Sequence, residues 1–290
     1  MTAFAVDFQR DRLVVAGDTL GYTPDRVEAR PLGYIPKVIP LPHVRGVIFG
    51  RGMQAIVVRA AAYLMLSPAL YTIEAAAEAL PNALYEISEE YADQVGIVDW
   101  RSVGLLECVL AGWSEAEGRM RMWSFASYER YKPYADHGAA NYGLLQFPRL
   151  PAKYAPCTDG MTRDESLVAI IEGAGQLFAD PAAQMGGARV GGEVIAIEVR
   201  PHGSMSQRTL YRFPDYQEMM HAGAATTARF DRGELDLDIA AGLVPIAEAV
   251  DPATGKRAVQ SVVPANDQPA SRQQRRAAER AARKAERRRA

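Results

Sequence analysis

Residues 2–19 read TAFAVDFQRDRLVVAGDT, and this stretch predicts a β-hairpin at the start of the chain. The apolar runs 3–8 and 13–17 have the length and composition of two short strands. The polar QRDR between them can turn, with Arg10 and Asp11 at its centre. The chain is therefore expected to begin with two antiparallel strands.

The predicted register gives this hairpin one apolar face and brings the chain start beside a carboxylate. It places Ala3 opposite Asp18 and Thr2 near Thr19. A slip of one residue would turn the apolar side chains to the other face, so the pattern specifies the register strongly. The facing apolar pairs are Phe8 with Leu13, Val6 with Val15, and Phe4 with Gly17.

Beyond the hairpin, strands come in pairs with helices between the pairs. This order favours an α+β fold over regular βαβ alternation. Thr162 and Glu165 form a capping-box signature that opens one of the helices. The expected elements are a strand at 44–49, a helix over 53–66, a helix over 72–94 that is broken near Pro81, a hairpin of 104–112 with 119–127, a helix over 163–178, and a hairpin of 193–199 with 207–213 that follows Gly191-Gly192.

The composition is that of an ordinary globular protein. The 290 residues are 48% hydrophobic with a net charge of -2, which fits one domain with appended segments. No apolar run approaches the roughly 18–20 residues that span a bilayer, and the start MTAFAVDFQRDR lacks a secretory signal pattern. Cys108 and Cys157 lack the spacing of a zinc site or a disulfide framework. We expect a cytoplasmic protein with no metal, no cofactor and no membrane partner.

Charge is distributed unevenly along the chain. Residues 271–290 carry nine Lys and Arg against two Glu, a net charge of +7, so the remaining residues carry -9. Three interpretations of this tail stay open: electrostatic binding of nucleic acid, docking on an acidic protein partner, or a mostly disordered or helical solubilising segment. The expected organisation is a domain at 1–214, a peripheral helical extension at 215–250, a linker at 251–270, and the basic tail.

The order of these motifs resembles that of proteasome β-subunits, which are N-terminal-nucleophile (Ntn) hydrolases. Their second strand ends in an Ala-Asp-Thr-like signature, matched here by Ala16-Gly17-Asp18-Thr19. A lysine follows, matched by Lys37, and then a Gly-x-Gly before a long helix, matched by Gly50-Arg51-Gly52. The resemblance covers residues 2–213. It implies a four-layer αββα sandwich that forms homo-oligomers such as rings or dimers.

The resemblance also implies a catalytic threonine. Thr2, exposed by removal of Met1, has the position of the nucleophile, and its own α-amino group is the base that accepts the hydroxyl proton. The unperturbed pKa of an α-amino group is about 8, close to what a base needs at neutral pH. Lys37 and Asp18 are implied as the supporting ion pair, and the N–H of Gly52 as the oxyanion donor. The implied reaction is hydrolysis of a peptide or other amide bond through an acyl-threonine intermediate.

Departures from the family pattern support a second hypothesis. The family has an Asp, with a Ser three residues later, that supports the nucleophile. Asp180 is the nearest candidate here, but position 183 is Ala. A Gly-Ser-rich segment expected before the Thr162 helix is replaced by NYGLLQFPRLPAKYAP. The alternative function is a catalytically silent scaffold or assembly protein, for example a virion-associated one, whose basic tail binds a partner.

A dinucleotide site is a rival interpretation of one motif. Residues 50–55 (GRGMQA) match G-x-G-x-x-A between a strand and a helix, and Glu74 follows about twenty residues on. A Rossmann unit usually has this motif after its first strand, whereas a hairpin precedes it here. The Ntn interpretation is therefore preferred.

An aromatic-rich stretch remains to be placed. Trp123, Tyr128, Tyr131 and Tyr134 fall within twelve positions. We expect them to pack in the core or on the surface, with the lining of a cleft as the alternative. Cys108, inside an apolar strand, is expected to be a core thiol.

Overall fold

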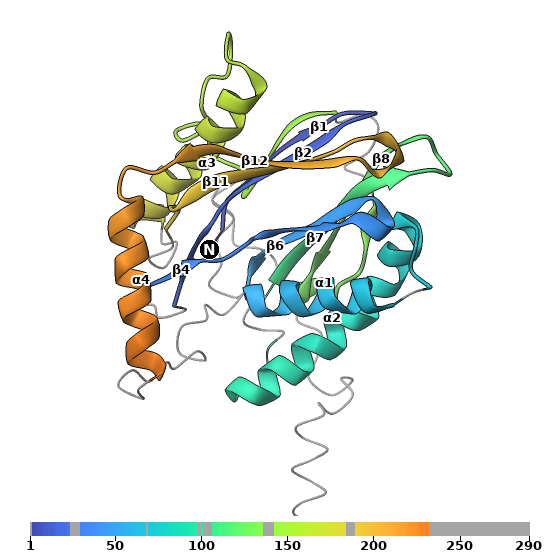
Figure 1. Ribbon diagram of the computed structural model, residues 1–290, viewed down its shortest axis with the longest axis horizontal. Helices are drawn as coiled ribbons and strands as arrows, with labels where there is room; N and C mark the ends of the chain where they lie inside the picture. Colours follow the sequence, from blue (N-terminus) through green and yellow to red (C-terminus); the bar gives the residue numbers. More distant parts are fainter. Residues whose placement is uncertain are drawn as a thin grey trace, which may run out of the picture.

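The computed structural model has an α+β fold built from antiparallel sheets and helices (Figure 1). This class was expected from the sequence and is confirmed. The linker at 251–270, the basic tail at 271–290 and the predicted helical extension beyond residue 231 lie outside the described residues. The structure describes residues 2–23, 30–67, 69–97, 100, 106–135, 142–183 and 189–231.

The N-terminal hairpin forms part of a five-stranded antiparallel sheet with the order β10-β1-β2-β11-β12. Strands β1 (Phe4–Phe8) and β2 (Leu13–Asp18) pair in the predicted register, with Phe4 opposite Gly17. The predicted hairpin of 193–199 with 207–213 is also present, as β11 (Glu193–Val199) and β12 (Met205–Arg212). Strand β10 (Gly143–Phe147), which the sequence pattern did not predict, pairs with β1.

A second five-stranded antiparallel sheet has the order β5-β6-β7-β8-β9. The predicted hairpin of 104–112 with 119–127 forms the centre of this sheet. A separate pair, β3 (Leu20–Tyr22) and β4 (Pro31–Tyr34), connects the two sheets along the chain. The strands of the second sheet are β5 (Val38–Leu41), β6 (Gly46–Gly52), β7 (Leu106–Ser114), β8 (Arg119–Ala126) and β9 (Tyr134–Ala135).

Two of the α-helices begin at threonine side-chain caps, Thr72 for α2 and Thr162 for α3. Thr162 and Glu165 form the predicted capping box: the Thr162 side chain accepts the N–H of Glu165, and the Glu165 carboxylate accepts the N–H of Thr162. No helix in the described ranges is both long enough and apolar enough to cross a membrane. The helices are α1 (Gln54–Leu66), α2 (Ile73–Val95), α3 (Arg163–Ala179) and α4 (Tyr216–Asp231).

Side-chain alternation along the hairpin explains how the layers pack. Ala3, Ala5 and Ala16 are on one face of the first sheet and form a cluster with α3. The larger Phe4 and Val6 are on the opposite face and form a cluster with the second sheet. Helices α1 and α2 cover the other face of the second sheet with a third cluster (Figure 1). Each sheet is therefore buried on one face by the other sheet and on the other face by helices.

Helix α2 corrects the prediction of a break near Pro81. The helix continues through Pro81 to Val95. A proline inside a helix costs about 3 kcal/mol, because it removes one hydrogen bond and clashes with the preceding turn. Leu80 and Leu84 on either side are fully buried, and each contributes about 1.5–3 kcal/mol of hydrophobic burial. Tertiary packing therefore outweighs the local preference.

Strand β6 corrects the predicted strand at 44–49. It begins at Gly46 and continues through the Gly-x-Gly motif to Gly52, because β7 pairs with it along its whole length. Gly50 allows this close pairing: a Cβ there would lie 2.8 Å from the carbonyl oxygen of Glu107. The motif thus belongs to a strand, and helix α1 begins only at Gln54.

Helix α4 packs against the small β3–β4 pair (Figure 1). A Cβ on Gly223 would lie 2.5 Å from the backbone nitrogen of Gly33, so this close approach requires glycine at position 223. The described part of the predicted extension is therefore helical and in contact with β4.

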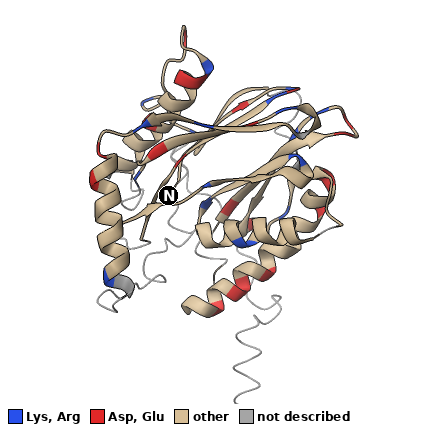
Figure 2. Ribbon diagram, viewed as in Figure 1, with Lys and Arg blue, Asp and Glu red and all other residues tan. Residues whose placement is uncertain are grey.

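Charged side chains are unevenly spread over the described residues (Figure 2). Helix α2 carries six Asp and Glu and no Lys or Arg. Acidic character in the folded part agrees with the negative net charge that the sequence gives to residues 1–270.

Candidate functional site

A buried carboxylate joins the start of the chain to two distant segments. Asp18, the last residue of β2, is fully buried. Its Oδ1 accepts the backbone N–H of Ala3 at 3.3 Å. Its Oδ2 accepts a hydrogen bond from Lys37 Nζ at 2.6 Å and one from the backbone N–H of Gly191 at 3.4 Å. One side chain therefore holds three separate segments together.

Lys37 lies between β4 and β5 and is buried. Burial lowers the pKa of Lys37, while the charge and hydrogen bond of Asp18 oppose this shift. Val38, the next residue, packs between the two sheets and fixes the segment. Desolvation makes a buried ion pair costly unless further hydrogen bonds satisfy it. The two backbone N–H groups on Asp18 provide such bonds.

Thr2 precedes β1 and is only 6% exposed. Because side chains alternate along an extended chain and Phe4 faces the second sheet, Thr2 is expected on the same side as Phe4. Its hydroxyl makes no hydrogen bond with another described residue, and Lys37 donates to Asp18. The structure thus links Thr2 to the Asp18–Lys37 pair through the backbone N–H of Ala3.

Gly52 ends β6 with a φ of 106°, which favours glycine. The side-chain Nε2 of Gln54 donates to the carbonyl oxygen of Pro36 at 2.9 Å, so the segment after Gly52 contacts the residue before Lys37. Within the described part of the chain, no hydrogen bond joins Gly52 directly to the other three predicted site residues. The predicted oxyanion donor is therefore connected to the site only indirectly.

The Gly191-Gly192 turn is a part of the site that sequence reasoning did not assign. Gly192 has a φ of 79°, and a Cβ there would lie 2.7 Å from the Thr19 hydroxyl oxygen. That hydroxyl oxygen accepts the N–H of Glu193 at 2.9 Å. The Gly-Gly pair was visible in the sequence. Its contact with Asp18 was not, because the two segments are 173 residues apart.

Tyr22 is a second unassigned neighbour of the carboxylate. Burial and, after it, the negative charge of Asp18 raise the pKa of Tyr22. The Tyr22 hydroxyl oxygen lies against the Gly191-Gly192 turn, 3.6 Å from the position that a Cβ on Gly191 would take. Tyr22 therefore stays a neutral phenol beside the buried pair.

Asp180 does not belong to this site. It follows α3 and accepts hydrogen bonds from Lys153, from the Tyr154 hydroxyl and from the N–H of Ala182. These contacts lower its pKa, with the Lys153 hydrogen bond as the largest cause. Asp180 is the C-cap residue of α3, and these contacts engage its carboxylate there. The supporting Asp that the resemblance implied is therefore not found at this position.

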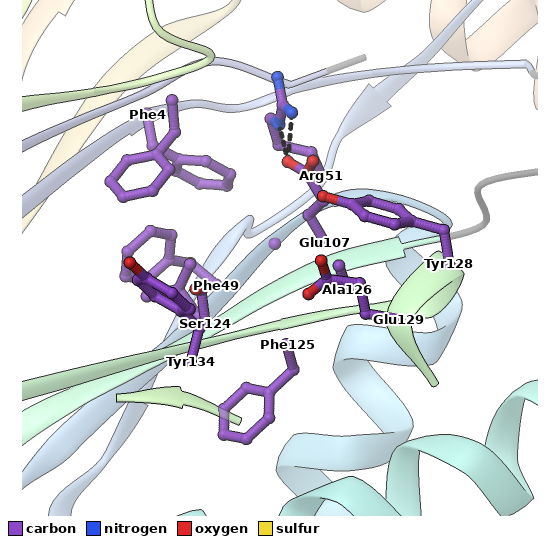
Figure 3. Close-up of a pocket in the computed structure, with 13 residues that line it drawn as sticks. Phe4, Phe49, Arg51, Glu107, Ser124, Phe125, Ala126, Tyr128, Glu129 and Tyr134 are labelled. Carbon is purple, nitrogen blue, oxygen red and sulfur yellow. Dashed lines mark hydrogen bonds and ion pairs between the residues drawn. The ribbon is translucent and has the colours of Figure 1, made fainter. Parts of the chain in front are cut away.

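A cavity of about 260 Å³ lies beside Phe4, two residues after Thr2. Figure 3 shows the rings of Phe4, Phe49 and Tyr134 on one side, and Arg51, Glu107, Tyr128 and Glu129 on the other. Tyr128 and Tyr134 thus line a cavity, whereas Trp123 and Tyr131 are buried in the core. The two alternatives for the aromatic-rich stretch each apply to part of it.

Rival sites receive no support from the described residues. These ranges contain no cluster of three or more His, Cys, Asp or Glu that could hold a metal ion. Residues 50–52, which suggested a dinucleotide site, are paired inside an antiparallel ladder, and Glu74 lies in the first turn of α2. Cys108 is buried, as expected of a core thiol, and burial raises its pKa.

Comparisons with known proteins give only distant structural likeness. No protein-family model and no curated protein matches the sequence. Among solved structures, Anbu (ancestral beta-subunit) from Yersinia bercovieri is similar at 12% identity and a TM-score of 0.49, covering 81% of this chain and 98% of that one. A Gly-1 mutant of Anbu from Hyphomicrobium sp. strain MC1 is similar at 13% identity and a TM-score of 0.46, covering 81% and 97%.

These findings correct the resemblance stated from the sequence. The chain was expected to resemble proteasome β-subunits, with an Ntn fold of that type. The two solved structures named above are instead Anbu proteins, with TM-scores of 0.49 and 0.46 and identities of 12% and 13%. A likeness of this size establishes no family.

Proposed function

We propose that the protein hydrolyses an amide or peptide bond with Thr2 as the nucleophile, after removal of Met1. The observation that carries the proposal is the buried Asp18–Lys37 pair next to the chain start. Buried ion pairs contribute little net stability and are costly to desolvate. Ionisable groups held in such surroundings are candidates for functional sites.

Each residue would have a defined role in this reaction. The α-amino group of Thr2 accepts the hydroxyl proton as the oxygen attacks the substrate carbonyl, and it then passes this proton to the departing amine. Water hydrolyses the acyl-threonine that remains, which regenerates the threonine. The positive charge of Lys37 favours the unprotonated amine and the developing alkoxide. Asp18 orients Lys37 and, through the N–H of Ala3, the backbone that carries Thr2. Gly52 is the proposed oxyanion donor.

The packing of α3, two sheets and the α1–α2 pair supports an αββα sandwich of the N-terminal-nucleophile type. Self-association is part of the same proposal. The exposed apolar side chains of Tyr63, Met65 and Leu66 on α1 favour it.

The test is the intact mass of the protein with and without a peptide epoxyketone. This electrophile closes a ring with both the hydroxyl and the amine of an N-terminal threonine. We expect one adduct on protein that lacks Met1, and none on Thr2→Ala. Thr162→Ala is the matched control, because it removes a threonine that only caps α3. Retention of Met1, or an adduct that persists in Thr2→Ala, contradicts the mechanism.

A silent scaffold is the second candidate. Two observations favour it: Asp180 is engaged away from Thr2, and the Thr2 hydroxyl has no hydrogen-bond partner among the described residues. Loss of Met1 without any adduct, over a panel of epoxyketones with basic, acidic and apolar side chains, would support the scaffold over the hydrolase.

A further inference from the structure

The cavity beside Phe4 has two chemically different walls. The aromatic wall is tightly packed: the Phe4 and Phe49 ring centroids are 4.9 Å apart, and those of Phe49 and Phe147 are 6.0 Å apart. Figure 3 shows Tyr134 on the same side. The Phe4–Phe49 pair is tilted and the Phe49–Phe147 pair is edge-on. Phe4 and Phe49 are almost fully buried, so Tyr134, which is 62% exposed, presents the open ring face of this wall.

The opposite wall carries the charges. Arg51 and Glu107 are direct cross-strand partners on β6 and β7, and Arg51 Nε donates to Glu107 Oε2 at 2.8 Å. The Arg51 Nη2 group also donates to the same carboxylate. This pair is neutral as a unit, so Arg51 adds no net positive charge to the cavity.

Glu129 supplies the remaining charge. Its carboxylate is exposed at the cavity and forms no hydrogen bond or ion pair with a described residue. Burial raises the pKa of Tyr128, the negative charges of Glu107 and Glu129 raise it further, and the positive charge of Arg51 lowers it. The net charge of the wall is therefore -1, opposite the aromatic rings.

An aromatic face and an unpaired carboxylate together recognise a cation. The ring quadrupole attracts ammonium and guanidinium groups, and the carboxylate accepts their hydrogen bonds. The volume of about 260 Å³ is below the 300–1,000 Å³ typical of drug-sized ligands. It suits one side chain or a small alkylamine.

We propose that this cavity binds a positively charged alkylammonium or guanidinium group between the aromatic wall, on which Tyr134 is the exposed ring, and the Glu129 carboxylate. Phe4 is two residues from Thr2 and lines the cavity directly. As a statement about substrates, which depends on the proposed function, the inference is that the hydrolysed amide carries a basic side chain.

The experiment measures binding in the Thr2→Ala variant, which cannot form an acyl-threonine. Three probes are titrated by NMR: the methylamides of Nα-acetyl-lysine, Nα-acetyl-norleucine and Nα-acetyl-glutamate. The lysine probe is expected to bind about tenfold more tightly than its neutral isostere, norleucine, and its affinity should fall as salt rises. Glu129→Gln should remove most of this preference, and Tyr134→Leu part of it.

The matched control is Glu78→Gln, which removes an exposed carboxylate on α2, outside the cavity lining. It should leave all three affinities unchanged. Equal or tighter binding of the norleucine or glutamate probe, no binding of the lysine probe, or no effect of Glu129→Gln overturns the proposal. Because these titrations do not need Thr2, their failure is distinct from failure to form the epoxyketone adduct in the wild-type protein.

Discussion

At the scale of single residues, the Asp18–Lys37 ion pair is the contact of the candidate site whose disruption we expect to cost the most stability. In Asp18→Asn the Lys37 ammonium loses its counterion while it stays buried. We expect a loss of about 3–5 kcal/mol in the free energy of unfolding at pH 7, because a buried unpaired charge is strongly destabilising. Urea unfolding of the two proteins measures this difference.

The double variant Asp18→Asn/Lys37→Met is the control for that prediction. It replaces the charged pair with neutral groups of similar size, so most of the lost stability should return. The pKa of Lys37 is lowered in the folded protein. The unfolded state therefore binds more protons between the folded and unfolded pKa values, and the stability of Asp18→Asn should rise with pH towards about 10. A single-variant loss below about 1 kcal/mol would contradict the account.

At the scale of elements, helix α2 is continuous although it contains Pro81. We expect Pro81→Ala to stabilise the protein by about 1–3 kcal/mol, because the alanine N–H can restore the missing helical hydrogen bond. The midpoint of urea unfolding should increase. Pro42→Ala is the control, since Pro42 lies at the start of a short 3-10 helix, where no intrahelical bond is missing. An unchanged midpoint in Pro81→Ala would show that the helix has adapted to the proline.

At the scale of the whole molecule, an acidic body is joined to a basic tail. Residues 271–290 carry a net charge of +7 against -9 for the remainder. We expect the full chain to retard RNA or DNA in a gel at about 50 mM salt and to lose this effect near 200 mM, independently of base sequence. Deletion of 271–290 should abolish the shift. No shift in the full chain would favour an acidic protein partner or a solubilising role.

Local patterns in the sequence account for a large part of this fold. The register of the first hairpin could be predicted because a two-residue periodicity and a short polar turn leave one pairing that buries Phe4 and Val6 together. That register already placed Ala3 opposite Asp18. The capping box at Thr162 was equally local, since both of its hydrogen bonds join residues three positions apart.

Long-range contacts were decided only by the tertiary structure. β10 pairs with β1 and Gly191 donates to Asp18, over separations that carry no periodic signal. The break expected at Pro81 failed for the same reason, because buried neighbours outweigh a local cost. The sequence by itself determined the hairpin and the α+β class. Tertiary packing decided that Asp180 lies elsewhere and that Phe4 and Glu129 line one cavity, because such contacts depend on how distant elements meet.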